Sequence, residues 1–257
     1  MAEDLEVRPL ATLEDVQRAS TLFDRIWEER RVMGAPLLRP MAAHGGQVLG
    51  AFEGGRMVGA LVGLVGLTER SEPVVHSHIT GVAPDAQHRG VGFELKKAQR
   101  EWCLTRDIEV VMWTMDPMVA RNARFNLHKL GAIGSAFHRD YYGPMDDAFN
   151  RGDRSDRLEI RWELRSERVE LAMAGKAEEP DLSEARVVVG PHGERWEREG
   201  PLLIVQVPNI YHALRESDPE GARRLRDAVA DAFEDLFGKG YLATGFASEG
   251  RYVLERT

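Results

Sequence analysis

The sequence has one cysteine, no long run of apolar residues and no excess of positive charge. The single cysteine, Cys103, excludes an intrachain disulfide and makes a reducing cytoplasm the expected location. The most apolar stretch, residues 57–67, is too short and too rich in glycine to span a bilayer. The first residues are acidic and lack the basic and apolar regions of a signal peptide. We therefore expect neither a membrane protein nor a secreted one.

The charge balance argues against a nucleic-acid-binding protein. The 257 residues include 34 Lys and Arg against 42 Asp and Glu, which gives a formal net charge of -8. Nucleic-acid binding requires a basic stripe, which this composition does not supply. Hydrophobic residues make up 43% and charged residues 30%, so we expect a globular protein with one large domain or two modest ones.

Hydrophobic periodicity over the first 165 residues predicts an antiparallel run of strands followed by alternating strands and helices. In chain order the expected elements are a strand at 5–10, a helix capped by Thr12, a hairpin of strands at 47–52 and 57–64, a strand at 74–82, a helix from Val91, a strand at 109–114, a helix at 116–130 ending at Gly131, and a strand at 132–142. The alternation in the second half predicts a parallel crossover in a mixed α/β sheet.

The last third of the chain has a different texture, which predicts a smaller α/β subdomain. The expected elements are strands at 186–189 and 202–207, a helix at 218–237, and short strands at 241–246 and 251–254. We place the domain boundary between 1–165 and 166–257. Residues 233–241 echo residues 125–132, and this echo predicts a degenerate half-repeat. We expect the arginines of the segment 223–226 to lie on the solvated face of the last helix.

The segment from Val82 to Gly92, with sequence VAPDAQHRGVG, has the features of a loop that holds a pyrophosphate. Backbone N–H groups at a helix start bind phosphate, provided that side chains are absent where the anion approaches. Two other glycine-loop motifs do not fit. A mononucleotide loop needs Lys after the second glycine, where Phe93 stands, and a dinucleotide fingerprint needs a third glycine or alanine at Leu95. On the loop alone, a plain glycine turn before a helix remains the favoured interpretation.

The context of this loop resembles the GNAT acyltransferase superfamily, whose hallmark is a strand ending Val-x-Pro and then Gln/Arg-x-x-Gly-x-Gly/Ala opening a long helix. Val82-Ala-Pro84 and Gln87-His-Arg-Gly90-Val-Gly92 match at the usual spacing. The resemblance covers residues 5–164 and extends to a subgroup with a C-terminal extension. It implies a central mixed β-sheet flanked by helices, with Val82, Gln87 and the segment from Gly90 to Gly92 in contact with coenzyme A.

Acyl transfer to an amine needs a base near the amine, because a protonated amine cannot attack a thioester. His76 and His78 are the candidates, since residues two apart on a strand share one face with each other and with Thr80. Their segment also resembles serotonin N-acetyltransferase, where two histidines at the matching positions relay the proton. The alternatives are a structural pair of histidines and a metal site, although no companion ligand for a metal is evident.

The general acid is less clearly marked. Many family members carry a tyrosine in the helix before the glycine, and Leu127 stands at that position here. Tyr141 or Tyr142 could act instead, and Tyr142 is our candidate; the alternative is that these adjacent tyrosines are core and surface neighbours on a strand. Asn122 and Asn126 lie one turn apart and are expected to face the pantetheine of coenzyme A, the alternative being two solvated side chains. We expect Asp116 to cap a helix rather than act in catalysis.

Together these features predict an acyl-CoA-dependent N-acyltransferase that acts on a small amine such as an amino acid, with acetyl-CoA or another acyl-CoA such as succinyl-CoA as co-substrate and no metal. We expect no nucleic-acid or membrane partner and leave a homodimer open. The alternatives are a non-catalytic acyl-CoA-binding module and a protein lysine acetyltransferase. The expected catalytic residues are His76, His78 and Tyr142, and the expected cofactor-binding residues are Thr80, Val82, Gln87, His88, Arg89, Gly90, Val91, Gly92, Asn122 and Asn126.

Overall fold

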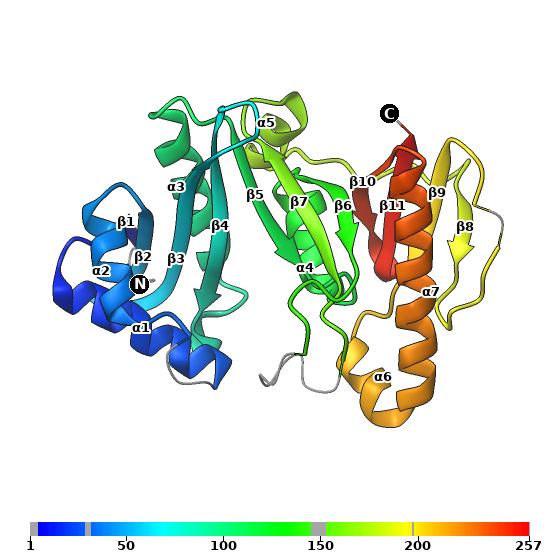
Figure 1. Ribbon diagram of the computed structural model, residues 1–257, viewed down its shortest axis with the longest axis horizontal. Coiled ribbons are helices and arrows are strands. Elements are labelled where there is room, and N and C mark those ends of the chain that lie inside the picture. The colour runs from blue at the N-terminus through cyan, green and yellow to red at the C-terminus, as the bar shows by residue number, and fades with distance from the viewer. Residues whose placement is uncertain (1–4, 29–31, 145–152, 197, 257) are drawn as a thin grey trace. The chain divides into compact units, whose positions relative to one another are not determined.

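The computed structural model describes residues 5–28, 32–144, 153–196 and 198–256 (Figure 1). These residues form two compact units, one up to Trp113 and the other from Thr114 onward. Each unit combines a β-sheet with helices, so the fold class is mixed α/β, as predicted. The boundary expected at residue 165 is a different division of the chain and stays a prediction. None of the described helices has the length and apolar character needed to cross a bilayer.

The first unit is built on strands in their sequence order. The strands are β1 (Glu6–Pro9), β2 (Gln47–Glu53), β3 (Arg56–Leu67), β4 (Pro73–Val82) and the first part of β5 (Val110–Met115). Neighbours are antiparallel from β1 to β4, whereas β4 and β5 are parallel. The helices are α1 (Leu13–Trp27), α2 (Ala35–Ala43) and α3 (Val91–Leu104), with a short 3-10 turn, η1 (Pro84–Ala86), before α3. The parallel pair requires a crossover, and α3 supplies it.

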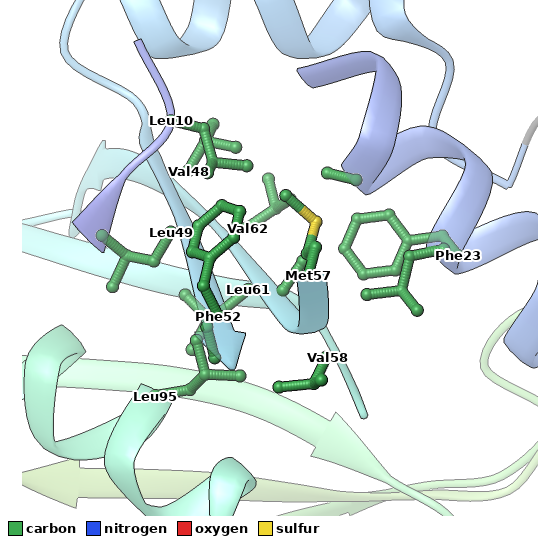
Figure 2. Close-up of a cluster of buried hydrophobic side chains, with 14 of the residues drawn as sticks. Leu10, Phe23, Val48, Leu49, Phe52, Met57, Val58, Leu61, Val62 and Leu95 are labelled. Atoms are coloured by element: carbon green, nitrogen blue, oxygen red, sulfur yellow. The ribbon is translucent and has the colours of Figure 1, made fainter. Parts of the chain in front are cut away.

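Helices α1 and α3 pack on opposite faces of this sheet. A side chain at Gly59 would meet Val91 and Leu95 of α3, whereas one at Gly81 would meet Phe23 and neighbouring residues of α1. Buried apolar residues from both helices and from β2 and β3 form the core between these layers. Figure 2 shows part of this core, including Phe23 from α1 and Leu95 from α3.

The second unit contains a sheet in the order β7-β6-β10-β11-β9-β8, antiparallel except for the parallel pair β8 and β9. Its strands are β6 (Ile133–His138), β7 (Arg157–Glu163), β8 (Arg186–Val189), β9 (Leu202–Gln206), β10 (Tyr241–Ala247) and β11 (Arg251–Arg256). Its helices are α4 (Ala120–Ala123), which continues as the π-helical turn η2 (Arg124–Lys129), α5 (Glu167–Met173), α6 (Tyr211–Ser217), α7 (Pro219–Gly238) and the short η3 (Ser248–Gly250).

Two helix–hairpin segments of this unit match each other at an interval of 109 residues. Gly131 after η2 and Gly240 after α7 both have positive φ, 69° and 85°. Gly134 and Ala243 pair with each other across β6 and β10. The register of each hairpin shifts directly after that residue. The degenerate half-repeat stays a prediction, and these three matched positions favour it.

The predicted strands and long helices are present, with differences at their ends. The helix expected from residue 116 begins at Ala120, because Asp116 instead accepts a hydrogen bond from the Met118 amide at 2.8 Å and forms a turn. Strand β6 ends at His138, four residues earlier than expected. The prediction that all arginines of segment 223–226 are solvated is wrong for Arg226, which is 4% exposed and paired with Asp116. Helices α2, α5 and α6 were not predicted.

Candidate active site

Strands β4 and β5 pair over a short distance only. Their parallel ladder consists of Val75 opposite Val111 and His76 opposite Met112. From Ser77 to Val82, β4 is paired with β3 alone among the described strands. A strand segment with one free edge presents backbone N–H and C=O groups that an extended ligand can bind.

Strand β4 contains a β-bulge at one of the two candidate histidines. Ser77 is opposite Gly63 and Ile79 is opposite Val62, so His78 is the extra residue. Ser77 faces α3, because its hydroxyl accepts a hydrogen bond from Lys96. His76 therefore points to the other face.

The bulge reverses the alternation of faces after His78. Val82 pairs with Gly59, which faces α3, so Thr80 faces α3 as Ser77 does. The expectation that Thr80 shares a face with the histidines is therefore wrong, since it assumed a regular strand.

His76 and His78 form a pair on the face opposite α3. Their ring centroids are 5.9 Å apart and the planes are tilted by 46°. His76 is half-buried and His78 is exposed overall. Partial desolvation of the His78 ring nevertheless lowers its pKa below the ordinary value. At neutral pH the ring is therefore in its neutral form, which can accept a proton.

The loop after β4 ends in a helix start whose N-cap residue has no side chain. Gly90 is the N-cap residue of α3 with φ 85°, and it makes no side-chain cap hydrogen bond. The preceding His88 also has positive φ, 64°. The first amides of a helix have no acceptor within it, so those of Val91 and Gly92 point outward. Together with the dipole of α3, they form a place for an anion.

The charged side chains of this loop are engaged elsewhere. Arg89 forms an ion pair with Glu53 at 2.9 Å, and Asp85 one with Arg56 at 2.7 Å. His88 is exposed and Gln87 is half-buried. Backbone amides are thus donors available to an anion at the helix start, and the binding of a pyrophosphate by this loop stays a prediction.

The remaining predicted residues belong to the second unit and are described within it. Asn122 is exposed, whereas Asn126 is buried and donates to the sulfur of Met115 at 3.0 Å. The π-helical turn between them alters the spacing that would have placed both on one face. Tyr142 lies in a turn after β6, and its hydroxyl is 3.1 Å from that of Thr114.

A buried polar network behind the histidines was missed by sequence analysis. The buried face of α3 consists of Val91, Leu95, Lys96, Gln99 and Cys103. Ala98 and Trp102, whose helical spacing from Val91 and Leu95 predicts the same buried face, are only half-buried. Cys103 is fully buried, and burial raises the pKa of its thiol to about 12. The sequence signal that could have revealed Gln99 as buried was its spacing, four residues after Leu95 and four before Cys103.

Among the described residues, no cluster of three or more His, Cys, Asp or Glu is arranged to hold a metal ion.

Comparison with known proteins agrees with this geometry. The model of the Acetyltransferase (GNAT) family matches residues 12–132. No curated protein sequence matches the chain. An acetyltransferase of the GNAT family from Streptococcus pneumoniae has 13% identity and a TM-score of 0.52, with 62% of this chain and 98% of that chain covered.

Two further solved structures are similar in fold. Arabidopsis thaliana Naa50, in complex with the bisubstrate analogue CoA-Ac-MVNAL, has 15% identity and a TM-score of 0.50 over 61% of this chain and 97% of its own. Chaetomium thermophilum Naa20, in complex with a bisubstrate analogue, has 17% identity and a TM-score of 0.50 over 64% of this chain and 91% of its own. Over residues 12–132 this chain has the sequence pattern of the Acetyltransferase (GNAT) family.

Proposed function

We propose that this chain is an acyl-CoA-dependent N-acyltransferase of the cytoplasm that acylates the amine of a small molecule such as an amino acid. Acetyl-CoA is the first candidate donor and succinyl-CoA the second, with direct attack in a ternary complex. The observation that carries the proposal is the uncapped start of α3, reached through a loop with two residues of positive φ, directly after a strand that has one free edge.

The residues of this loop fit the pyrophosphate of coenzyme A. A Cβ atom on Gly90 would enter open space rather than a neighbouring side chain, so the approach to the helix start is clear. The amides of Val91 and Gly92 would hold the phosphates, and the free edge of β4 would hold the extended pantetheine arm. The donor supplies a thioester, whose carbonyl is the electrophile.

The chain itself must take up a proton from the amine. His78 is the proposed base, because its lowered pKa keeps it neutral at working pH, and His76 stands 5.9 Å away to pass the proton on. Tyr142 is the proposed acid for the departing thiolate. Its hydroxyl makes a hydrogen bond with Thr114, which fixes its orientation. The base needs no metal, since a neutral imidazole is a sufficient acceptor.

A mixed panel tests this proposal. The protein is incubated with acetyl-CoA or succinyl-CoA and with free amino acids, polyamines, other small amines and lysine-containing peptides, and products are identified by mass spectrometry. Acylated small amines are the expected result. Products from peptides alone would favour a protein acetyltransferase. Binding of acetyl-CoA in calorimetry without any product would favour a non-catalytic module.

Histidine variants test the assigned base. We expect His78→Ala to lower kcat by about 100-fold, and His76→Ala by less, because general base catalysis contributes factors of that order. Acetyl-CoA affinity, measured by calorimetry, should stay unchanged in both. Full activity of His78→Ala would show that another group removes the proton.

A further inference from the structure

Lys96 contacts both strands at the place where their pairing ends. Its Nζ donates to Ser77 Oγ at 2.8 Å and lies 3.9 Å from the centroid of the Trp113 ring. The last rung between β4 and β5 pairs His76 with Met112. Ser77 follows His76 in β4, and Trp113 follows Met112 in β5. One side chain of α3 therefore touches the first residue beyond that rung on each strand.

Buried amides hold Lys96 in this position. Its Nζ also donates to Gln99 Oε1 at 2.9 Å, and Gln99 Nε2 donates in turn to Gln47 Oε1 at 2.6 Å. Gln47 and Gln99 are fully buried, Lys96 is 4% exposed and Ser77 is 6% exposed. The network thus connects α3 and β2 with the two strands that separate.

The network is an unfavourable choice for packing alone. The neighbours of the Lys96 ammonium described above are a hydroxyl, an amide and an aromatic ring, none of which carries a formal charge. Burial lowers the pKa of Lys96 to about 7. An apolar side chain of similar length would fill the same space without this desolvation. Local departures from good packing of this kind are expected at functional positions.

We propose that Lys96 is a positioning residue of the acyl-transfer site, which fixes the point where β4 and β5 separate and thereby holds His76 and His78 in place. The inference rests on the proposed function. Ser77 stands between the two histidines, so a shift of its backbone moves both imidazoles. The bulged His78 has no partner on β3, and the strand ladder alone therefore does not fix it.

The test compares Lys96→Met with Lys97→Met. Both changes remove one ammonium from α3, but the side chain of Lys97 is 51% exposed and serves as the matched control. We expect Lys96→Met to lower kcat about tenfold, because a small displacement of a catalytic group costs this much, while KM for acetyl-CoA is retained. Its melting temperature should be unchanged or higher, which separates positioning from loss of fold. Lys97→Met should behave as the wild type.

A second measurement does not depend on catalysis. Amide hydrogen exchange at residues 77–79 should be faster in Lys96→Met and unchanged in Lys97→Met. If the wild type acylates amines but Lys96→Met keeps its kcat, or loses kcat only in step with its melting temperature, the positioning role is wrong and the proposed function stands. If the wild type makes no product, the proposed function fails. In that case, unchanged amide exchange at residues 77–79 in Lys96→Met overturns the inference as well. Faster exchange supports the part of the inference that concerns how Lys96 holds β4.

Discussion

Helices α3 and α7 are long helices that begin in opposite ways. Asp218 caps α7 by accepting from the Gly221 amide at 2.8 Å, and Pro219 fills its first position. The start of α3 has neither device, only Gly90 with φ 85°. A capped start uses its own amides for stability, whereas an open start leaves them to a ligand. The difference favours α3 over α7 as the place of the proposed anion site.

The same two helices each bury a cation, again in opposite ways. Burial works against the charge of Arg226 in α7, but Asp116 and Tyr211 outweigh it and raise its pKa. Arg226 Nη2 is 2.9 Å from Asp116 and 3.3 Å from Asp153. Lys96 in α3 contacts the neutral groups described above, and its pKa is lowered. Arg226 belongs to a structural ion pair, whereas Lys96 is an ammonium group that is buried although water would solvate its charge better.

The largest effect that would separate the two cations is on stability. We expect Arg226→Met to lower the free energy of unfolding by about 3 kcal/mol, because it removes a buried guanidinium that is paired with Asp116 and Asp153. Lys96→Met should not lower it. Urea unfolding at pH 7 measures both, and Arg223→Met, at an exposed position of the same helix, is the control. A loss in Lys96→Met equal to that in Arg226→Met would remove the distinction.

The two helix starts should respond differently to single substitutions. Gly90→Ala places alanine in a left-handed conformation, which costs about 1–2 kcal/mol of strain. If the loop relaxes away from its binding form to relieve this strain, KM for acetyl-CoA should rise about tenfold. Asp218→Ala removes a cap and should lower stability by about 1 kcal/mol with KM unchanged. Steady-state kinetics and thermal unfolding of both variants decide the matter. A rise in KM for acetyl-CoA in Asp218→Ala as well would contradict the proposed difference between the two helix starts.

A further expected effect is a pH dependence of stability to which Lys96 contributes. Its pKa is about 7 in the folded protein and 10.5 ordinarily. Between these values the unfolded chain binds a proton that the folded chain does not, so stability rises with pH. The free energy of unfolding of the wild type, relative to Lys96→Met, should increase from pH 7 to pH 9 by at most about 1.4 kcal/mol per pH unit. A flat difference over this range would show that Lys96 stays charged when buried.

Local signals allowed much of the fold to be predicted from the sequence. The helix expected at 218–237 is present as α7. Thr12 accepts from the Asp15 amide at 3.0 Å, and Gly131 ends a helix with positive φ, both as expected. Each of these depends on residues within one helical turn. Helix α2 escaped prediction because Pro40 stands inside it, where proline normally disfavours a helix.

The candidate site was predicted less completely because its geometry depends on distant residues. The bulge at His78 arises from pairing with β3, so the strand pattern alone could not place Thr80. Arg226 looked like part of a solvated run because its partner Asp116 is 110 residues away. Lys96 is unremarkable in a helix sequence until Ser77 and Trp113 are brought beside it. The loop from Val82 to Gly92 could be proposed as a phosphate site from the sequence because its residues are contiguous.

The extra residue at His78 also bears on how such a strand can change over time. It changes which residues of β4 face α3: odd-numbered residues such as Ser77 do so before it, and the even-numbered Thr80 and Val82 do so after it. Mutations around the histidines can then accumulate without disturbing the side chains of Thr80 and Val82 that face α3. A deletion of this single residue would make the strand regular and leave Thr80 and Val82 paired with β3 and facing α3, so it would be far milder than a one-residue slip of the strand register.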